Sequence, residues 1–433
     1  MSEKRASFSS RIGAILVAAG STIGLGSIWR FPYIVGESGG GAFILLFLVC
    51  MLLIGVPIML AEFAIGTHTR KSPVKAYSQL SPRWKWLGYN SILVSILISG
   101  FYYIVAGWSL EYLVASVDGS LYESSNFHTT FEAFTQSWRE PLYTVIFVLL
   151  THLIVVMGVQ KGLERTTKVM MPLLFVMLIV MAVRSAMMEG AAEGYRFLFM
   201  PDFSKIWNIN TIINAIGQAF FALSIGLGCM IAYASYFKEG TNLTRTSLSV
   251  SLMTLLVAIL SGIVIFPAVF SFKGLEPSAG PTLIFETLPF IFNEMPMPQL
   301  WSSLFFLLIA MAALTSTISF HEVMTQYLQE NHSMGRRNAA RLVSLFTIVA
   351  AALCLWSGRI FDLFDMATAE YLMPIGGLFT AIFAGWVLDR KIFRDQMSNH
   401  GRLRAPLFGV LVVLLKWVCP ILLTLVFVYN LIF

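Results

Sequence analysis

Two short glycine-rich segments, far apart in the chain, have the composition of places where a helix breaks. Residues 22–27 read Thr-Ile-Gly-Leu-Gly-Ser, and residues 224–229 read Ser-Ile-Gly-Leu-Gly-Cys. Glycine in a helix interior costs about 1 kcal/mol relative to alanine, so clustered glycines mark backbone that readily leaves the helix. A broken helix exposes carbonyl oxygens, which attract cations, and amides, which attract anions. The two segments therefore predict a site for an ion or a small polar solute.

A third segment contributes hydroxyl groups. Thr315, Ser316, Thr317 and Ser319 lie close together in an otherwise apolar run. A single serine or threonine in such a helix usually bonds a carbonyl of its own backbone. A cluster is different, because several oxygen atoms together suit a hard cation. Set beside the two glycine-rich segments, this cluster favours a site for an alkali cation.

These segments lie in long apolar runs, and the composition places the whole chain in a membrane. Of the 433 residues, 57% are hydrophobic and 12% are charged, whereas soluble chains carry about 25% charged residues. A bilayer core requires about 20 apolar residues per helix. The sequence predicts an all-α polytopic membrane protein whose eleven transmembrane spans cover residues 11–35, 40–67, 87–116, 141–159, 165–188, 212–236, 246–272, 300–329, 340–357, 364–388 and 407–431.

The basic residues indicate how the chain is oriented. Most of the 29 Lys and Arg residues fall in alternate connections, with segments 68–86 and 389–406 the richest. Because basic connections stay on the cytoplasmic side, we expect a cytoplasmic N-terminus and a C-terminus outside. The first apolar run follows Arg11 and lacks a cleavage site, so no signal peptide is expected. The net charge of +6 reflects this asymmetry and lipid contact, and no nucleic-acid partner is expected.

Two connections on the outer side have distinct compositions. Segment 189–211 is polar and contains Pro201, which predicts a surface loop. Segment 276–299 contains five prolines, too many for one continuous helix, and it predicts a bent re-entrant cap rather than a twelfth span.

Catalytic chemistry finds little support in the sequence. The six histidines have no metal-ligand spacing, and no nucleophile motif is present. All four cysteines lie inside apolar runs, where they predict core residues: Cys50, Cys229, Cys354 and Cys419. We therefore expect a protein that is not an enzyme. A channel and a non-transporting sensor remain as alternatives to a transporter.

The spacing of the two glycine-rich segments predicts an internal repeat. They fall in the first and sixth spans, which cross the membrane in opposite directions. Transporters with inverted repeats place the substrate and the coupling ion at such a pair of broken spans. The expected organisation is one transmembrane domain, residues 1–433, with inverted repeats at about 11–188 and 212–388 and a final helix at 407–431.

The same residues carry a resemblance to a known family. Residues 11–14, 20–32, 39–43, 57–63, 217–224 and 314–318 resemble the neurotransmitter:sodium symporters, in particular bacterial members with the leucine-transporter fold. The resemblance covers essentially the whole chain. It implies a 5+5 inverted repeat with broken helices 1 and 6, sodium-coupled import, and a bacterial inner (plasma) membrane location.

The resemblance also implies a bound Na⁺ ion. The family's second sodium site falls on the carbonyls of Gly20, Ile23 and Ala312 and on the hydroxyls of Thr315 and Ser316. Every side chain that this site needs is present, so we expect the second sodium site to be retained.

The family's first sodium site departs from the pattern. Where members commonly carry an amide, a hydroxyl, and Asn or Asp, this chain has Ser27, Ala222 and Thr254. No carboxylate stands at Val257 or Ala258 to replace the family's chloride. In relatives that carry amino acids, the first ion also contacts the substrate carboxylate. We therefore expect a single coupled sodium ion, or a solute that is not an ordinary amino acid.

The implied substrate site draws on four spans. Its residues are Thr22, Gly24, Leu25, Gly26, Ile98, Tyr102, Phe221, Ser224, Leu227, Ser316 and Phe320. The apolar side chains among them favour an aromatic or aliphatic solute. Two classes remain open: a hydrophobic or aromatic amino acid or derivative, and a neutral or amine-bearing aromatic such as an indole, with altered ion coupling.

Charged side chains inside the spans are costly in a bilayer and mark functional positions. There are four candidates: Arg30, Glu62, Glu322 and Asp365. The resemblance implies an outer gate and an inner latch. Their residues are Arg30 with Asp365, Gln218 and the lid Phe221 on the outside, and Arg5 with Glu330 on the inside.

Overall fold

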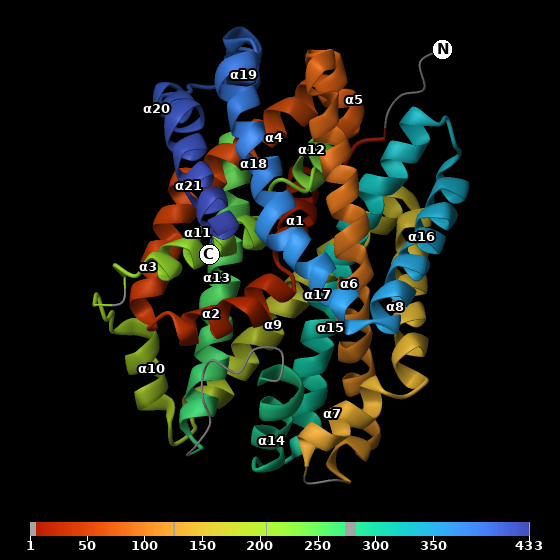
Figure 1. Cartoon of the computed structure of the whole chain (residues 1–433), viewed down its shortest axis with the longest axis vertical. Coiled ribbons are helices and arrows are strands. Elements are labelled where there is room, and N and C mark those ends of the chain that lie inside the picture. Colours follow the sequence, from red (N-terminus) through yellow and green to blue (C-terminus); the bar gives the residue numbers. More distant parts are fainter. Residues whose placement is uncertain (1–5, 124–125, 205, 273–282, 433) are drawn as a thin grey trace.

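The computed structural model describes residues 6–123, 126–204, 206–272 and 283–432, which form an α-helical bundle (Figure 1). Within these ranges, the only β structure is an isolated bridge between Gly40 and Pro201. Nine helices in these ranges are long and apolar enough to cross a membrane. A tenth span combines α1 (Arg11–Thr22) with the segment Gly26–Glu37, bent by 58°. The predicted all-α membrane fold is thus confirmed.

Every predicted span has a helical counterpart at its place in the chain. The long spans are α3 (Gly41–Cys50) continued by η2 (Met51–Gly55) and α4 (Val56–Thr69); η3 (Pro82–Trp84) with α6 (Lys85–Asp118); α8 (Arg139–Val156); η5 (Val159–Glu164) with α9 (Arg165–Ala186); α13 (Leu243–Phe270); α15 (Pro298–Asn331); α16 (Arg336–Trp356); α17 (Gly358–Met366) with η7 (Ala367–Leu372), α18 (Met373–Ile382) and η8 (Phe383–Val387); and α20 (Phe408–Val413) with η9 (Leu414–Val418) and α21 (Cys419–Ile432). The sixth span consists of two pieces, α11 (Ile209–Leu223) and α12 (Cys229–Ala234). Each piece is too short to cross a bilayer alone, so helix length does not confirm the count of eleven.

The first span breaks where the glycines predict. Helix α1 ends at Thr22, and the chain resumes as η1 (Gly26–Arg30) and α2 (Phe31–Glu37). Ile23, at the end of α1, has φ −92° and ψ 84°, which is outside the helical region. The residues between Thr22 and Gly26 therefore leave backbone groups free for other partners.

The sixth span breaks at the matching segment. Ser224, Gly226 and Gly228 all have positive φ, at 50°, 81° and 77°. A Cβ at Gly226 would lie 2.4 Å from the carbonyl oxygen of Met373, so only glycine allows this approach. The amide freed at Gly226 donates to Glu62 Oε1 at 2.8 Å. A buried carboxylate on α4 thus replaces the lost helical hydrogen bond.

Two groups of helices surround these breaks. Helices α6 and α15, each of 34 residues, pack along one another, and α8 and α16 pack against both (Figure 1). In the second group α12 packs on α4 and α1 packs on α13, while α1 and α12 also contact α15. The broken segments therefore face the middle of α6 and α15.

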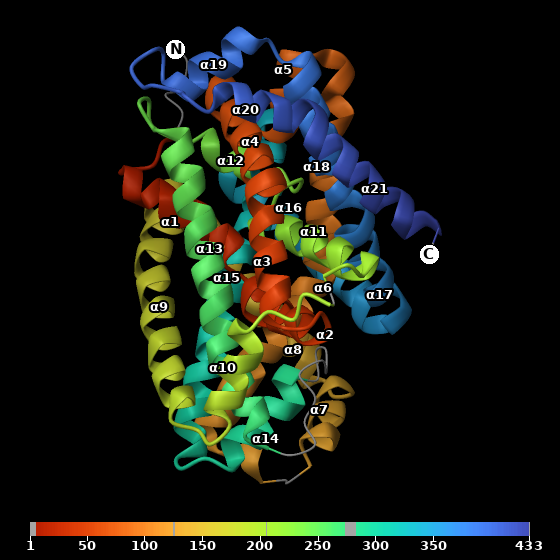
Figure 2. The same cartoon turned by 90° about the vertical axis from the view of Figure 1, so that its left-hand side faces the viewer.

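The remaining elements are short and lie toward the two ends of the bundle. They are α5 (Pro73–Leu80), η4 (Ser120–Tyr122), α7 (Phe127–Thr135), α10 (Ala191–Phe199), η6 (Leu283–Thr287), α14 (Leu288–Asn293) and α19 (Arg390–Ser398). Helices α5 and α19 lie at one end, and α7, α10 and α14 lie at the other (Figure 2).

The expected surface loop at 189–211 was wrong in part, because α10 forms there and packs on α13. Its Leu198 is fully buried, and a Cβ on its Gly194 would lie 2.5 Å from the nitrogen of Pro267. Of the predicted cap at 276–299, η6 and α14 are helical, and residues 276–282 lie outside the described residues.

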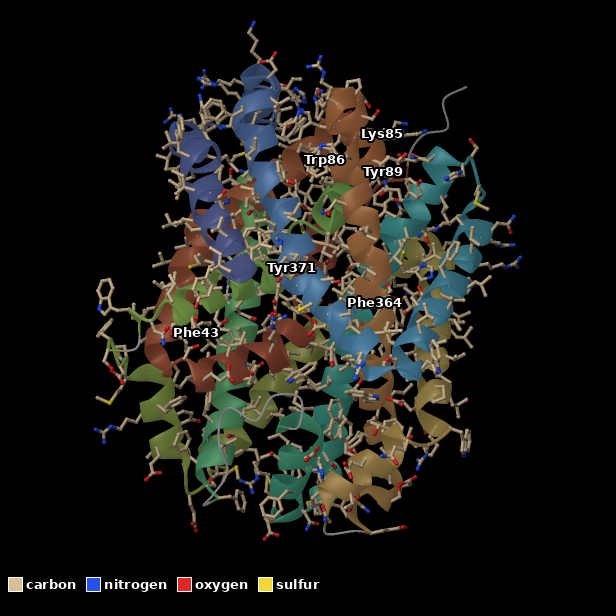
Figure 3. All side chains as sticks on the ribbon, in the orientation of Figure 1. Phe43, Lys85, Trp86, Tyr89, Phe364 and Tyr371 are labelled. Carbon is tan, nitrogen blue, oxygen red and sulfur yellow. The ribbon has the colours of Figure 1, made fainter. Side chains whose placement is uncertain are left out.

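Aromatic and basic side chains gather at the end that carries α5. Lys85, Trp86 and Tyr89 lie there together (Figure 3), with Lys85 Nζ 5.3 Å from the Tyr89 ring centroid. Such rings are typical of the level at which helices leave the hydrocarbon. In the interior, all four cysteines are buried and free, as predicted.

Candidate functional site

The two breaks meet α6 and α15 around one cavity. It is lined by Ser21, Thr22, Gly24, Gly26, Ile98, Tyr102, Phe221, Ser224, Leu227, Ser316, Phe320 and Met373. Every predicted substrate residue except Leu25 lines this cavity. Ser21 and Met373 join it, and Met373 has no signal in the sequence, because it enters only where α18 crosses the broken sixth span. The structure thus brings the predicted residues together, and their role in binding stays a prediction.

Hydrogen bonds tie the spans around the cavity to one another. The Leu25 amide donates to Tyr102 Oη at 3.0 Å, which joins the first break to α6. Ser224 Oγ donates to the carbonyl of Ser21 at 2.8 Å, which joins the two breaks. The Tyr102 and Phe320 rings meet edge to face at 5.3 Å. The polar groups of the broken segments are therefore satisfied partly by α6 and partly by each other.

The cavity is nearly filled by its own side chains. Its volume is about 10 Å³, which is about the space that one water molecule requires. Gly26, Tyr102 and Phe221 also line a second, adjacent cavity of about 270 Å³, together with residues that include Trp29, Trp108 and Asp362. We call this second cavity the vestibule. A solute can enter the central cavity only after a side chain such as Phe221 moves.

Arg30 and Asp365, the predicted outer gate, both line the vestibule. No ion pair joins these two described side chains. Instead, the Arg30 guanidinium lies 4.8 Å from the centroid of the Phe221 ring. Gln218 Nε2 donates to the carbonyl of Gly26 at 2.8 Å. Arg30, Phe221 and Gln218 thus couple the two broken spans, and Asp365 lines the same vestibule.

This arrangement predicts that Arg30→Ala and Asp365→Ala each impair uptake. The cation–π contact alone contributes about 1–2 kcal/mol when shielded from water, so we expect at least about a fivefold loss for Arg30→Ala. Arg30→Lys should rescue uptake only partly, because an ammonium group lacks the planar fork that stacks and pairs. Initial rates of sodium-driven uptake in vesicles measure both effects. The exposed Arg359 on α17 provides a control, since Arg359→Ala should transport normally. Normal uptake by Asp365→Ala would refute the gate.

The predicted sodium ligands lie where α1 meets α15. Thr315 Oγ1 lies 3.4 Å from the carbonyl oxygen of Ile23 and donates to that of Ala312 at 2.9 Å. A Cβ on Gly20 would lie 3.4 Å from Thr315 Cβ, so the end of α1 is in direct contact. Ser316 follows on α15 and faces Gly24. These are all hydroxyl and carbonyl oxygens, which fit a hard monovalent cation.

The region of the family's first sodium site is occupied by hydrogen bonds within the protein. Thr22 Oγ1 and Thr254 Oγ1 lie 2.7 Å apart, and Thr254 also donates to the carbonyl of Val250. Ser27 Oγ donates to the carbonyl of Thr22 at 3.2 Å. Ala222 is fully buried and offers no side-chain oxygen. The oxygens that remain here are thus partners of one another.

At the end of the bundle that carries α5, the predicted latch residue Arg5 lies outside the described residues, so its pair with Glu330 stays a prediction. The Glu330 carboxylate accepts the amide of Ser72 at 2.8 Å, and its backbone carbonyl accepts Lys75 Nζ. Glu330 therefore connects α15 to the start of α5.

Sequence reasoning missed two residues that close this end. Phe8 is fully buried, with its ring 6.4 Å or less from those of Tyr233, Tyr236 and Phe237. Glu164 accepts the amide of Ser9 at 2.5 Å and its hydroxyl at 2.6 Å. These contacts join residues more than 150 positions apart, and such pairings leave no local signal.

Glu322, expected to be functional because of its depth, has structural partners. It forms an ion pair with Arg336 at 2.5 Å and accepts Tyr236 Oη at 2.8 Å. Its charge is therefore compensated, and it links α15 to α16 and to the segment that follows α12. Glu62 has a single hydrogen-bond partner, the Gly226 amide at the sixth-span break, and its Oε2 is buried without one.

Comparisons with known proteins agree with this geometry. The model of the sodium:neurotransmitter symporter family matches residues 5–142 and 126–433. A sodium-dependent transporter of Haemophilus influenzae is 35% identical over 99% of both chains, and YhdH of Bacillus subtilis, also a sodium-dependent transporter, is 34% identical over 98% of this chain and 97% of its own. The human sodium- and chloride-dependent GABA transporter 2 is 26% identical over 92% of this chain and 75% of its own.

A solved structure is similar along the whole chain. The crystal structure of MhsT in complex with L-phenylalanine matches with a TM-score of 0.91 and 36% identity, covering 98% of this chain and 99% of that one. The bundle, the broken spans and these matches lead to one conclusion: the chain belongs to the sodium:neurotransmitter symporter family and is a multi-pass membrane transporter.

Proposed function

We propose that the protein is a sodium-coupled symporter that imports a small hydrophobic or aromatic solute by alternating access, with one sodium ion per cycle. The observation that carries this proposal is the meeting of both broken spans with the hydroxyl cluster of α15 around one enclosed cavity. Residues 11–188 and 212–388 would act as its inverted repeats. Substrate and sodium would bind side by side, since Ser316 belongs to both sets of predicted ligands.

The chemistry of the cavity supports an aromatic solute. Phe221 and Phe320 provide ring faces, Ile98 and Leu227 provide aliphatic surface, and Tyr102 provides a hydroxyl. No charged side chain lines the cavity among the residues that the structure describes. MhsT, the structural neighbour, was crystallised with L-phenylalanine, which supports an aromatic amino acid or a derivative. The hydrogen-bonded first-site region favours the alternative, a neutral or amine-bearing aromatic such as an indole.

The proposed orientation has a cytoplasmic N-terminus and an outer C-terminus, in the inner membrane of a bacterium. The start of α1 lies near α19, since a Cβ on Gly240 would lie within 4 Å of both Arg11 and Asn399. Helices α5 and α19, with the basic residues around them, lie at that same end (Figure 1). The positive-inside rule therefore supports this orientation.

The direct test is uptake into vesicles containing the purified protein. A panel of aromatic amino acids, aliphatic amino acids, indoles and arylamines is offered with an inward sodium gradient, and then with potassium in place of sodium. The proposal requires saturable uptake that needs sodium. Sodium-independent flux above carrier rates would instead indicate a channel, and binding without uptake would indicate a sensor.

The composition of the first-site region predicts the sodium stoichiometry. A hard cation is surrounded by about six oxygens, and Ser27, Ala222 and Thr254 do not supply such a set. Uptake should therefore depend on sodium with a Hill coefficient near one. The substrate carboxylate would also lack its cationic partner, so analogues without a carboxylate should compete almost as well as the parent. Competition and sodium titration of initial uptake rates measure both.

Restoring the family pattern provides the control for this prediction. The triple variant Ser27→Asn, Ala222→Thr, Thr254→Asn should raise the Hill coefficient and favour zwitterionic substrates. A sigmoidal sodium dependence in the unaltered protein, with a strict need for a free carboxylate, would contradict the prediction.

A further inference from the structure

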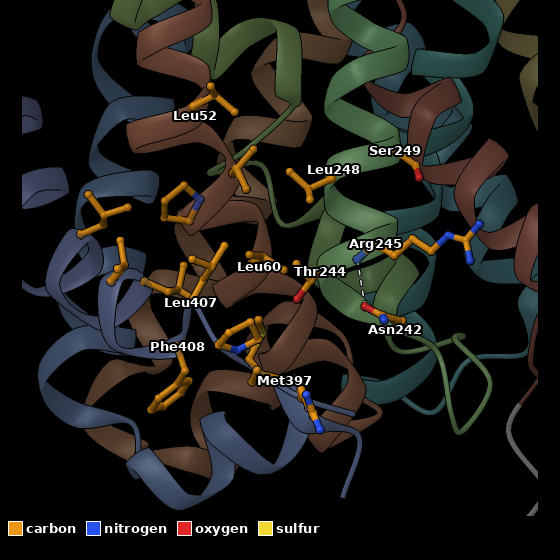
Figure 4. Close-up of a pocket in the computed structure, with 18 of the residues that line it drawn as sticks. Leu52, Leu60, Asn242, Thr244, Arg245, Leu248, Ser249, Met397, Leu407 and Phe408 are labelled. Atoms are coloured by element: carbon orange, nitrogen blue, oxygen red, sulfur yellow. Dashed lines mark hydrogen bonds between the residues drawn. The ribbon is translucent and has the colours of Figure 1, made fainter. Parts of the chain in front are cut away.

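Two open grooves flank α20 on the outside of the bundle. The larger, about 570 Å³, lies between α4, α13 and α20 (Figure 4), and there the Arg245 side chain points away from Leu407 and Phe408. The smaller, about 340 Å³, is lined by two cations, Arg390 and Lys416, and by apolar side chains that include Phe408, Val412, Val413 and Trp417. We call the smaller one the Lys416 groove. Arg390 of α19 and Lys416 of η9 bring two basic side chains from different helices to this groove, whereas the larger groove is lined by Arg245 and Arg404.

Lys416 has an unusual environment for a charged residue. It lies within the apolar run of the last span, where an uncompensated charge is costly. Its Nζ lies 4.0 Å from the centroid of the Trp386 ring and 5.7 Å from that of Trp417. Among the described carboxylates, none forms an ion pair with Lys416 or Arg390. The groove thus holds two positive charges and no negative charge of its own.

The aromatic rings around this groove are of the kind found at membrane interfaces. Trp386 and Trp417 are each about half exposed, at 52% and 51%, and their rings meet edge to face at 4.9 Å. The ring of Phe383, in the same η8 segment, packs at 5.4 Å on Trp84, which is next to Trp86 at the α5 end. Tryptophans in this position mark the boundary between hydrocarbon and lipid headgroups. We therefore expect Lys416 and Arg390 to reach the level of the lipid phosphates.

The backbone holds this arrangement in place. Trp386 Nε1 donates to the carbonyl of Lys416 at 3.0 Å. A Cβ on Gly385 would lie 2.8 Å from the Cα of Lys416, so η8 and η9 are in close contact. The side chains of Lys416 and Trp386 consequently keep their relative positions, which lowers the entropic cost of binding a ligand there.

We propose that the Lys416 groove binds an anionic phospholipid, with its phosphate between Lys416 and Arg390 and one acyl chain along Phe408, Val412 and Val413. Basic pockets between membrane helices recognise acidic headgroups in this way. A zwitterionic lipid fits less well, because its own ammonium group adds a third positive charge. A free anion fits less well, because the apolar side of the groove would stay unfilled. This inference goes beyond the transport function and does not depend on which solute is carried.

Native mass spectrometry of the purified protein can test the lipid preference. Phosphatidylglycerol and phosphatidylcholine with identical acyl chains are offered in equal amounts, and bound lipid is counted. A cation near the headgroups contributes about 1 kcal/mol, so Lys416→Gln and Arg390→Gln should each lower the preference for phosphatidylglycerol about fivefold, and the double variant about thirtyfold. Lys416→Arg should keep most of the preference.

Matched controls make the result specific to this groove. Lys391→Gln removes the same charge from α19, and Arg245→Gln removes one beside the larger groove; both should keep the wild-type preference. The proposal is wrong if the double variant also keeps the wild-type preference for phosphatidylglycerol, or if the control variants lose that preference to the same extent. A second test uses the unaltered protein and therefore does not depend on whether the variants fold. A photoactivatable phosphatidylglycerol should crosslink to it within residues 408–417. If soluble glycerol phosphate reduces this crosslinking as much as unlabelled phosphatidylglycerol does, the lipid assignment is wrong.

Discussion

Replacing Thr315 and Ser316 together by alanine should abolish both the stabilisation of the protein by sodium and sodium-driven uptake. Thr315 Oγ1 lies beside the carbonyl oxygens of Ile23 and Ala312, so the double variant removes both side-chain ligands of the proposed site. A ligand at 100 times its dissociation constant stabilises the folded state by about 2.7 kcal/mol. This stabilisation is measured as the sodium increment, the Tm in sodium minus the Tm in potassium. In the double variant the sodium increment should fall to zero.

Thr317 on the same helix provides the control for this experiment. Its hydroxyl lies 2.9 Å from that of Thr151 on α8 and is not among the proposed ligands. Thr317→Ala should lower the Tm in both salts and leave the sodium increment unchanged. If the double variant keeps the increment, the sodium site lies elsewhere.

Gly24→Ala should reduce substrate uptake to background. The added Cβ would lie 2.2 Å from Ser316 Oγ and 2.7 Å from Tyr102 Oη, and contacts this short force atoms apart. The methyl group would occupy a cavity of only about 10 Å³ and would displace two of its few polar groups. Because Ser316 is also a proposed sodium ligand, the sodium increment in Tm should decrease as well. Uptake and thermal stability measure the two effects separately.

Gly217→Ala is the matched control on α11. A Cβ at Gly217 meets no atom within 4 Å, so this variant should transport normally. It should also be more stable by up to about 1 kcal/mol, since alanine favours the helix. If Gly24→Ala takes up substrate as fast as Gly217→Ala does, the solute binds elsewhere in the protein.

The sequence could predict the breaks in the first and sixth spans because their cause is local. The glycines of residues 22–27 and 224–229 lower helix stability where they stand, whatever surrounds them. The positive φ angles of Gly226 and Gly228 are a direct result. The residues predicted to line the cavity could also be identified, because they match the family's pattern along the whole chain and related chains place matching residues at the same positions in the fold.

Other contacts depend on packing between distant helices and could not be predicted. Arg30 was expected to pair with Asp365, yet it lies over the Phe221 ring. That choice depends on a few ångströms of separation between the first span and α17. The hydrogen bond from the Ser9 amide to Glu164 could not be predicted for the same reason, since it requires the chain before α1 to lie against the start of α9. Charge and hydropathy along the chain do not determine such distances.

The burial of all four cysteines has a practical consequence for following the transport cycle. Because the four native thiols are buried in the folded protein, polar maleimides should leave the unaltered chain largely unlabelled. A cysteine introduced at an exposed position, such as Ile12 at the start of α1 (68% exposed), would then be the sole site of reaction. Fluorophores or spin labels could therefore report the movement of the first span in a protein that keeps its natural sequence everywhere else.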